Sequence, residues 1–351
     1  MESFRILFVG EIEPFQTTIA RRDAFLELGF PLEAVDRNEF LKNLSPTLQR
    51  LSFYSLRTAP VFAFNREILD RARRFRPELI WIEKGVYVFP ETLRSLRRDF
   101  SPLLVHHNTD DSRGLRPALR LHWRYLSRAM RMYDVLITSN LHNVRELREA
   151  GFPRVCHMEL AASPAMMPPA DLADAERGRI GAPVGFIGHW EPATEDLLLH
   201  LLRGGVELKI FGHNWAKAHA RAELGSACQN QTVWGPEYAR TALSFDINLG
   251  IVSSHNRSHT ATRTFQIPAL GAFMLHERND VVTALFEEGV EAEFFGSKEE
   301  LLAKCRHYLA NPEERRRIAE AGRRRCERSG YSELDRVREI VPVLAEALRA
   351  R

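Results

Sequence analysis

The stretch that most constrains the fold lies in the second half of the chain, at residues 245–277. It reads FDINLGIVSSHNRSHTATRTFQIPALGAFMLHE. The apolar run Ile247–Val252 predicts a strand, and a polar loop follows it. A helix is expected to begin near Thr262 and to bend or end at Pro268, and apolar residues 272–275 predict a second strand. A strand, a loop, a helix and another strand in this order form a β-α-β unit, which requires a parallel sheet.

Arg263 stands in the first turn of that predicted helix. The first N–H groups of a helix have no partner within the helix, so a helix N-terminus attracts anions. A fixed positive charge at the same place strengthens this attraction. The sequence therefore indicates an anion site at Arg263. The alternative is an ordinary loop-to-helix connection whose arginine pairs with a surface carboxylate.

Short apolar strands alternate with amphipathic helices along both halves of the chain. Such alternation predicts an α/β fold with helices on both faces of a parallel sheet, and 351 residues are enough for two such domains. We therefore expect two Rossmann-like, doubly wound domains facing a cleft, with ligands beyond the carboxyl ends of the strands. The expected division is a first domain at residues 1–165, a proline-rich linker at 166–182, a second domain at 183–330, and a C-terminal helix at 331–351 that packs back on the first domain.

The composition argues against several classes of protein. A net charge of +3 is too small to indicate nucleic-acid binding. No apolar run approaches the roughly 20 residues that span a bilayer, and the first residues lack the pattern of a signal peptide. We therefore expect a cytoplasmic protein. The four cysteines are far apart and form no CxxC pair, so free thiols are expected rather than disulfides or zinc ligands.

Glycine follows three of the apolar runs in the second half, at Gly188, Gly212 and Gly235. The last of these runs, residues 232–234, predicts a very short strand. A glycine at a strand end lets a backbone N–H approach a phosphate closely, although a tight turn can need glycine for steric reasons alone. The chain has no GxxxxGK[ST] loop and no GxGxxG after its first strand. With Arg263, the recurring glycines favour a phosphate-bearing ligand held outside a P-loop.

Several motifs of the second half resemble a known family. The motifs are VGFIGHW, LKIFGHNW, VWGP, TRTFQIPALGAFMLHE and, further on, ALFEEGVEAEFF with a helical segment ending near Tyr331. Together they resemble the C-terminal domain of GT-B glycosyltransferases of the group 1 kind, and most closely the spore-maturation CgeB-like group. The likeness covers about half of the chain in good register. The first half matches mainly through its fold pattern and the strand RILFVG.

The resemblance implies a nucleoside diphosphate sugar as donor, bound mainly by the second domain, and a hexosyltransferase-like activity on an acceptor held by the first domain. Arg263 would lie at the donor diphosphate. Gln266 stands where relatives usually carry a glutamate that binds the ribose, and Ser258 stands where retaining relatives carry a second glutamate. The family generally needs no protein-bound metal or other cofactor, so His255 and His259 are expected to be ordinary loop residues.

Other residues near the predicted strand ends are donor-site candidates, each with a structural alternative. His189 and His213 could donate to a phosphate or a sugar, or could lie exposed in loops. Trp234 or Tyr238 could flank a base, with packing slightly favoured, and Trp215 is expected in the core. The predicted donor-site residues are Gly188, His189, Gly212, His213, Trp234, Gly235, Tyr238, Thr262, Arg263 and Gln266.

Catalytic candidates for the acceptor side lie at the end of a predicted strand in the first half, in the sequence HHNTDD. A carboxylate of Asp110 or Asp111, or the imidazole of His107, could take a proton from an acceptor hydroxyl. The alternative for the two aspartates is a turn and a helix N-cap, which are common roles for adjacent acidic residues.

An arginine stripe follows these residues. Segment 113–132 contains no acidic residue, and Arg116, Arg120, Arg124 and Arg128 recur at every fourth position. On one helix these residues would share a face. That face is either a solvated surface or a contact for an anionic acceptor or an anionic membrane, which would place the protein at the inner face of the membrane.

The sequence therefore predicts a GT-B glycosyltransferase that moves a sugar from a nucleoside diphosphate sugar to an acceptor hydroxyl. Two alternatives stay open, a nucleotide-sugar epimerase and a sugar- or nucleotide-binding protein with weakened catalysis. Gln266 and Ser258 motivate the second alternative. Nucleic acid is not an expected partner, since the basic stripe lacks the interleaved aromatic residues of such sites. The base, the sugar, the acceptor, the stereochemistry and the oligomeric state are left open.

Overall fold

The computed structural model describes residues 3–113, 120–163 and 174–351. The chain divides into two compact units. Unit 1 consists of Met1–Glu159 and Glu333–Arg351, and unit 2 consists of Leu160–Ser332. Of the predicted linker, residues 166–173 lie outside the described residues, and a helix begins at Asp174.

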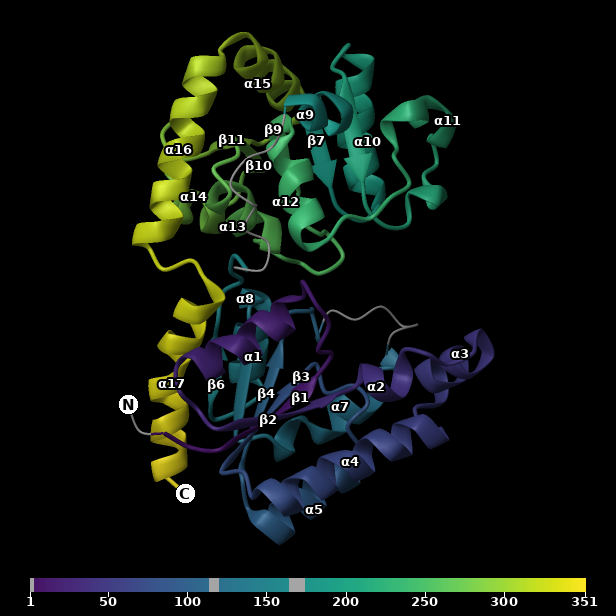
Figure 1. Cartoon of the computed structure of the whole chain (residues 1–351), viewed down its shortest axis with the longest axis vertical. Helices are drawn as coiled ribbons and strands as arrows, with labels where there is room; N and C mark the ends of the chain where they lie inside the picture. Colours follow the sequence, from purple (N-terminus) through teal and green to yellow (C-terminus); the bar gives the residue numbers. More distant parts are fainter. Residues whose placement is uncertain (1–2, 114–119, 164–173) are drawn as a thin grey trace. The chain divides into compact units, whose positions relative to one another are not determined.

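Unit 1 is built on a six-stranded parallel sheet (Figure 1). The strand order is β2-β1-β3-β4-β5-β6, so the chain starts near the middle of the sheet and winds outward in both directions. The strands are β1 (Ile6–Gly10), β2 (Leu32–Asp36), β3 (Leu79–Glu83), β4 (Leu103–Asn108), β5 (Val135–Thr138) and β6 (Val155–His157). The helices are α1 (Thr17–Glu27), α2 (Asn38–Leu41), α3 (Pro46–Ser55), α4 (Ala59–Phe75), α5 (Pro90–Phe100), α7 (Arg124–Ala129), α8 (Leu141–Glu149) and α17 (Glu333–Arg349).

Both faces of this sheet are covered by helices, which explains why its strands are apolar on both sides. Successive side chains of a strand point to opposite faces. Leu7 and Ile82 therefore join the core under α4 and α5, whereas Phe8 and Trp81 join a second core with α1 and α17. The last helix of the chain thus completes the hydrophobic core of the unit that contains the first strand.

A buried charge network ties α17 to the sheet. The Arg21 guanidinium of α1 lies 2.7 Å from Glu83 at the end of β3 and 3.2 Å from Glu333 at the start of α17. All three side chains are almost fully buried. Burial opposes ionisation of Glu83, but Arg21 and the neighbouring His107 outweigh it and lower the pKa of Glu83. Burial raises the pKa of Glu333, and Arg21 offsets this only in part.

Unit 2 contains a five-stranded parallel sheet in the order β11-β10-β9-β7-β8 (Figure 1). Its strands are β7 (Ala182–Ile187), β8 (Leu208–Phe211), β9 (Phe245–Gly250), β10 (Met274–Glu277) and β11 (Glu293–Phe295). Its helices are α9 (Asp174–Ile180), α10 (Pro192–Arg203), α11 (Arg221–Leu224), α12 (Gly235–Leu243), α13 (Thr262–Ala269), α14 (Asp280–Leu285), α15 (Lys298–Ala310) and α16 (Pro312–Arg328). The expected β-α-β unit is present as β9, α13 and β10, and α13 ends directly after Pro268.

Two expectations about secondary structure are wrong, and a segment without a predicted element forms a helix. Residues 232–234 form no strand, since they pair with none of the five strands of the sheet. Residues 46–55, which show no clear pattern, form α3, whose N-cap Ser45 accepts a hydrogen bond from Leu48. Segment 113–132 is not one long described helix: α7 is short, and residues 130–132 tighten into a 3-10 turn.

The arginine stripe is therefore broken. Arg116 lies outside the described residues. Arg124 donates to the carbonyl groups of Tyr54 and Ser55 and lies over the Tyr125 ring, so it holds the end of α3 instead of facing solvent as one of a row. Among the described positions, Arg120 precedes a turn at residues 121–123, and Arg124 and Arg128 lie on α7, so these three arginines do not share one continuous helix. In the described part of the chain, moreover, each helix is too short or too polar to cross a bilayer.

The Arg21 network generates a first prediction. Arg21→Ala should destabilise unit 1 by about 3–5 kcal/mol, because it leaves two buried carboxyl groups without their cation. The melting temperature by scanning calorimetry should fall, and hydrogen exchange of peptides from α17 should rise. Arg22→Ala is the matched control, since Arg22 pairs only with its exposed neighbour Asp23. Equal melting temperatures for the two variants would contradict the role assigned to the network.

Candidate functional site

The candidate site lies at the carboxyl edge of the unit 2 sheet, where β7, β8 and β9 are neighbours. Loops after these strands carry four of the ten predicted donor-site residues, and three more lie on α13, which follows the third loop. Residues 188–191 follow β7, residues 212–215 follow β8, and residues 251–261 connect β9 to α13. The site is thus assembled from segments that lie far apart in sequence, because parallel strands end at one edge.

Arg263 is the central cation of this edge. Its guanidinium donates from Nη1 to the Ile251 carbonyl oxygen at 2.8 Å and lies over the Phe186 ring, 5.2 Å from the centroid. No carboxylate oxygen of the described residues lies within ion-pair distance of it. Burial lowers the pKa of Arg263, and the influence of Tyr238 and Glu191 offsets this only in part. A half-buried guanidinium without a counter-ion is well suited to bind an anion.

Gly188 makes room for this guanidinium. A Cβ atom at Gly188 would lie 2.7 Å from Nη2 of Arg263 and 2.6 Å from the Phe186 ring. Gly212 has a positive φ of 135°, and a Cβ there would lie 2.0 Å from the Gly188 carbonyl oxygen. The N–H groups of both glycines are already used, since they donate to Phe211 and Gln231. The glycines therefore supply space beside Arg263, whereas their own amides are occupied.

The hydrogen-bond donors that remain free at this sheet edge belong to other residues. The Thr264 N–H of α13 donates to the Ala261 carbonyl oxygen, whereas the N–H groups of Thr262 and Arg263 have no partner among the described residues. The N–H of His189 has no partner among the residues that the structure describes. Arg263, the start of α13 and the His189 amide thus present positive charge and hydrogen-bond donors at one sheet edge. This combination fits a phosphate or diphosphate.

Glu191 fixes the shape of the edge, and the sequence reasoning missed it. Its buried carboxylate accepts hydrogen bonds from the Ser253 hydroxyl and from both the hydroxyl and the N–H of Ser254. His189 lies 2.8 Å and His255 3.3 Å from the same carboxylate. Burial opposes ionisation of Glu191, but these contacts outweigh it and lower the pKa of Glu191 to about 2. The carboxylate therefore clamps the loop after β9 to the loop after β7.

The aromatic candidates fall into two groups. Trp215 and Tyr238 are buried, as expected for Trp215, and the Trp215 indole N–H donates to the Gly188 carbonyl oxygen. Burial raises the pKa of Tyr238 to about 12. Trp234 instead is 44% exposed beside the His213 ring, so the preference for core packing at Trp234 is wrong. An exposed indole near a phosphate site can stack on a nucleobase.

The remaining predicted donor-side residues lie on or near α13. Thr262 opens the helix, and Gln266 is buried one turn after Arg263. Ser258 lies in the loop, where its N–H donates to the Ser253 carbonyl. Gly235 opens α12 with a φ of 54°. These positions agree with a donor site at this edge, and the individual contacts to a ligand stay predictions.

Glu277, at the end of β10, is a further acidic group that sequence reasoning did not single out. Its carboxylate accepts a weak hydrogen bond from the Val252 N–H at 3.4 Å. Burial raises the pKa of Glu277, and the nearby Glu191 charge adds to the effect. The signal in the sequence was the position of Glu277 just after the apolar run 272–275. Because parallel strands end together, the last residue of each run lines the same edge.

The acceptor-side candidates of unit 1 separate into buried and accessible groups. His107 is fully buried, with Nδ1 2.8 Å from Glu83, and Asp111 is buried and accepts a hydrogen bond from Asn143. Neither side chain is presented at the surface of the sheet edge. Asp110 is one-third exposed and lies 2.8 Å from the Lys84 ammonium. Of the three predicted catalytic residues, Asp110 is thus the most exposed.

Metal ligands are not gathered at either edge. No group of three histidine, cysteine, aspartate or glutamate side chains within the described ranges could hold a metal ion. His255 pairs with Glu191, as noted above, which gives it a structural role. The four cysteines are free thiols, and Cys228, Cys305 and Cys326 are buried.

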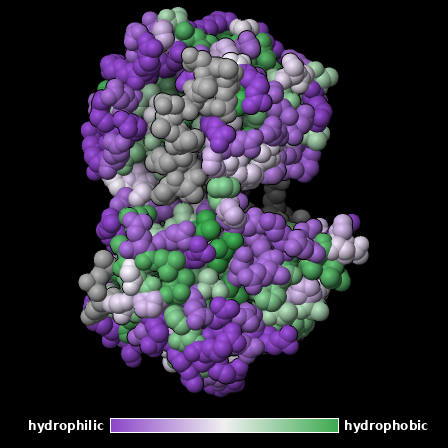
Figure 2. Space-filling view, in the orientation of Figure 1, coloured by the Kyte–Doolittle hydropathy of each residue, from purple (hydrophilic) through white to green (hydrophobic). Residues whose placement is uncertain are grey.

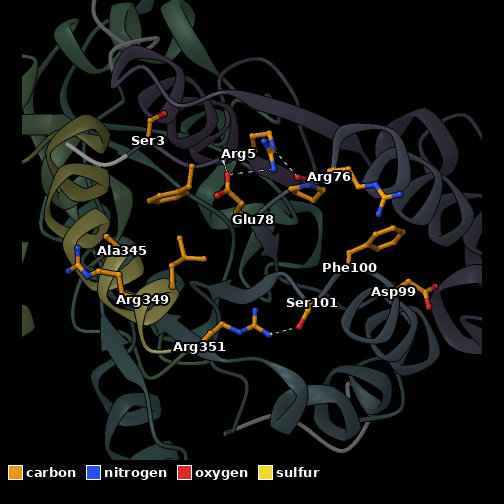
Figure 3. A pocket seen from close by; sticks show the side chains of 13 residues that line it. Ser3, Arg5, Arg76, Glu78, Asp99, Phe100, Ser101, Ala345, Arg349 and Arg351 are labelled. Carbon is orange, nitrogen blue, oxygen red and sulfur yellow. Dashed lines mark hydrogen bonds and ion pairs between the residues drawn. The ribbon is translucent and has the colours of Figure 1, made fainter.

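A wide pocket of about 820 Å³ lies at the opposite, amino-terminal end of the unit 1 sheet (Figure 3). Arg5, Arg76, Arg349 and Arg351 surround it together with Glu78. Helices α4, α5 and α17 all end nearby, and their last carbonyl groups carry partial negative charge. The arginines offset this charge, as when the Arg5 guanidinium donates to the Arg76 carbonyl oxygen at 2.8 Å. The charge of these arginines at the carboxyl ends of three helices therefore has a structural explanation.

The Glu191 clamp yields a second prediction. Glu191→Ala should raise the hydrogen-exchange rate of peptides covering residues 252–258 by roughly an order of magnitude, because the loop loses several bonds to one charged acceptor. The control Glu207→Ala alters an exposed glutamate of the same unit and should leave the rate unchanged. Unaltered exchange in Glu191→Ala would show that the loop is held by other contacts.

The clamp should also depend on pH. The folded-state pKa of Glu191 is below its unfolded value, so its stabilisation is complete above about pH 5 and is lost as the pH falls towards 2. Protection factors of the loop in the wild type should decline over this range by more than those of Glu191→Ala.

Comparisons with known proteins agree with this architecture. Residues 193–341 match the model of a family described as glycosyl transferase-like. The match covers fewer than half of the residues; it begins after residues 188–191 and includes residues 212–215, the loop 251–261 and the whole of α13. No curated protein matches the sequence.

Solved structures of similar fold extend over the whole chain. Sucrose-phosphate synthase from Thermosynechococcus elongatus is 11% identical with a TM-score of 0.71, covering 99% of this chain and 100% of that one. A glycosyltransferase from Rickettsia africae is 10% identical with a TM-score of 0.66, covering 100% of both chains. Anabaena Alr3699/HepE in complex with UDP-glucose is 12% identical with a TM-score of 0.61, covering 98% and 100%. The chain therefore has the α/β fold of GT-B glycosyltransferases, with two parallel sheets flanked by helices.

Proposed function

We propose that this protein is a glycosyltransferase that uses a nucleoside diphosphate sugar as donor, with the donor bound at the carboxyl edge of unit 2. One observation carries the proposal. The half-buried Arg263 guanidinium has no carboxylate partner in the described part of unit 2, whereas other buried charged groups, such as Arg21 and Glu293, lie in ion pairs. A bound diphosphate would supply the missing negative charge.

The chemistry follows from where charge develops. When the bond between the sugar and the donor diphosphate breaks, negative charge grows on the leaving phosphate oxygens. Arg263 and the first N–H groups of α13 would stabilise that charge more strongly in the transition state than in the bound donor. Gln266 offers an amide that can bond a ribose hydroxyl, and Trp234 offers an exposed ring for the base. The UDP-glucose bound by the structurally similar HepE supports a donor of this class.

The acceptor would bind to unit 1, where Asp110 is the accessible predicted base. Its partner Lys84 has a positive φ of 56°, which a residue with a side chain seldom adopts. Such backbone strain at the end of a central strand is typical of functional sites. The transferred sugar, a hexose by the resemblance, and the CgeB-like assignment stay predictions.

A nucleotide-sugar epimerase is the second candidate, because a putative UDP-N-acetylglucosamine 2-epimerase from Listeria monocytogenes also shares the fold, with a TM-score of 0.59. An epimerase converts its donor without any acceptor. Incubation of UDP-sugars with the protein alone, followed by chromatography, separates the two functions. Appearance of an epimeric UDP-sugar would replace the proposal of transfer, whereas UDP release that needs an added acceptor would support it.

A third prediction concerns binding at Arg263. At least one nucleotide in a panel of UDP, GDP, ADP, TDP and CDP should raise the melting temperature of the wild type. At a hundredfold excess over Kd, binding adds about 2.7 kcal/mol to the free energy of unfolding. Arg263→Ala should abolish the rise, and Arg263→Lys should keep part of it, since an ammonium retains charge but loses the planar fork. Arg203→Ala is the control, because Arg203 forms only an exposed pair with Glu223. A rise that survives in Arg263→Ala would place the nucleotide elsewhere.

A fourth prediction tests the space beside the guanidinium. Gly188→Ala should weaken nucleotide binding at least tenfold by calorimetric titration, because its Cβ would displace Nη2 of Arg263. Gly178→Ala is the control, since a Cβ at Gly178 would meet no atom within 4 Å. Equal affinities for the two alanine variants would mean that Arg263 does not need its present position to bind the ligand.

A further inference from the structure

We propose that unit 1 carries a second binding surface, which docks on an anionic lipid bilayer. The surface consists of Arg50, Leu51 and Tyr54 of α3, Phe62 of α4, and Leu121, and we call it the α3 surface. The inference rests on unit 1 alone and does not depend on the proposed transfer reaction.

The apolar members of the α3 surface are strongly exposed. Leu51 is 53% exposed, Tyr54 46%, Phe62 49% and Leu121 51%. Single exposed apolar residues are ordinary, but four large ones in one region are not. Leu51 and Tyr54 are three positions apart on α3, so they share its outer face with Arg50, while Ser52 of the same helix is buried. Green and pale side chains are visible over α3 in Figure 2.

Contacts beneath the surface show that these residues belong together. The His122 ring stacks on the Phe53 ring at 3.9 Å, and Arg124 donates to the carbonyl oxygens of both Tyr54 and Leu121. Leu121 is therefore fixed beside the end of α3. The link to Phe62 runs through stacked side chains, from Arg124 over Tyr125 to Phe89 and then to the Phe62 ring at 5.1 Å.

Basic residues predominate in the segments that carry this surface. In sequence, residues 40–66 and residues 112–133 contain no aspartate or glutamate, and they carry Lys42 and nine arginines. Carboxylates of neighbouring segments pair with two of these basic residues, Glu13 with Lys42 at 2.7 Å and Glu91 with Arg57 at 3.8 Å. Arg50 forms no hydrogen bond or ion pair within the part of the chain that the structure describes, and its side chain is exposed. Against a second copy of this chain, arginines would face arginines, which disfavours self-association. Negative phosphate groups of a bilayer complement the surface.

Exposed leucine and aromatic side chains beside arginines are what an interfacial membrane contact requires. The apolar side chains enter the boundary between headgroups and acyl chains, and the arginines remain at the phosphates. α3 is only ten residues long, and the surface offers four apolar side chains. Binding should therefore be weak, reversible and strongly dependent on anionic lipid and on salt.

The test uses the full chain with vesicles of phosphatidylcholine alone and of phosphatidylcholine mixed with phosphatidylglycerol, in a sedimentation assay at low and high salt. The wild type should sediment with the anionic vesicles at low salt and not with phosphatidylcholine alone. The double variant Leu51→Ser/Tyr54→Ser should bind at least about tenfold more weakly because its inserted apolar area is lost. Arg50→Gln should bind about fivefold more weakly through loss of one charge near the lipid surface.

Matched controls separate the α3 surface from general effects. Leu26→Ser removes an apolar side chain of α1 that is 47% exposed, and Arg94→Gln removes an exposed charge of α5. Both should bind anionic vesicles like the wild type. All variants should keep the wild-type melting temperature, because the altered side chains are exposed.

Four outcomes would overturn the proposal. They are a wild type that does not bind the anionic vesicles, a Leu51→Ser/Tyr54→Ser variant that binds as tightly as the wild type, and controls that lose as much binding as the α3 variants. The fourth is a wild-type dimer in analytical ultracentrifugation that the double variant abolishes, which would assign the surface to a second copy of this chain.

Discussion

The shape of the candidate site depends on the buried carboxylate of Glu191. Its acceptor oxygens receive hydrogen bonds from both serines of the loop after β9 and from His189 of its own loop. This arrangement converts two separate strand ends into one rigid edge. It also satisfies the Glu191 charge locally, so that the neighbouring Arg263 stays without an acidic partner. Glu191 thus holds the two loops together, and Arg263 keeps no acidic partner among the described residues.

The contrast with unit 1 shows why this difference matters. Arg21 is almost fully buried, and two carboxylates lie within ion-pair distance of its guanidinium. The result is a structural tie between α17 and the sheet. Arg263 sits at a sheet edge and rests instead on a carbonyl oxygen and an aromatic ring. Both environments limit solvent, but only the second leaves a guanidinium without a carboxylate partner among the described residues.

Much of the fold could be predicted from sequence because its signals are local. A buried parallel strand needs a run of apolar residues, and a helix against it needs apolar positions at helical spacing, so β9, α13 and β10 follow from residues 245–277. Errors arose where local patterns are weak. Helix α3 keeps apolar side chains exposed. The arginine spacing in 113–132 suggested a continuous helix, but residues 121–123 form a turn and residues 130–132 a 3-10 turn.

The sequence by itself thus determined the fold class and the place of Arg263 at a helix start, because strand periodicity and helix polarity depend on neighbouring residues. Only the tertiary structure decided which charges are paired. Glu191 and Ser254 are 63 positions apart, and Arg21 and Glu333 are 312 apart, so no local pattern links them. The same holds for His107, which sequence places at a strand end and folding buries against Glu83. Pairing and burial arise when distant segments meet, and they decide which polar residues remain able to bind a substrate.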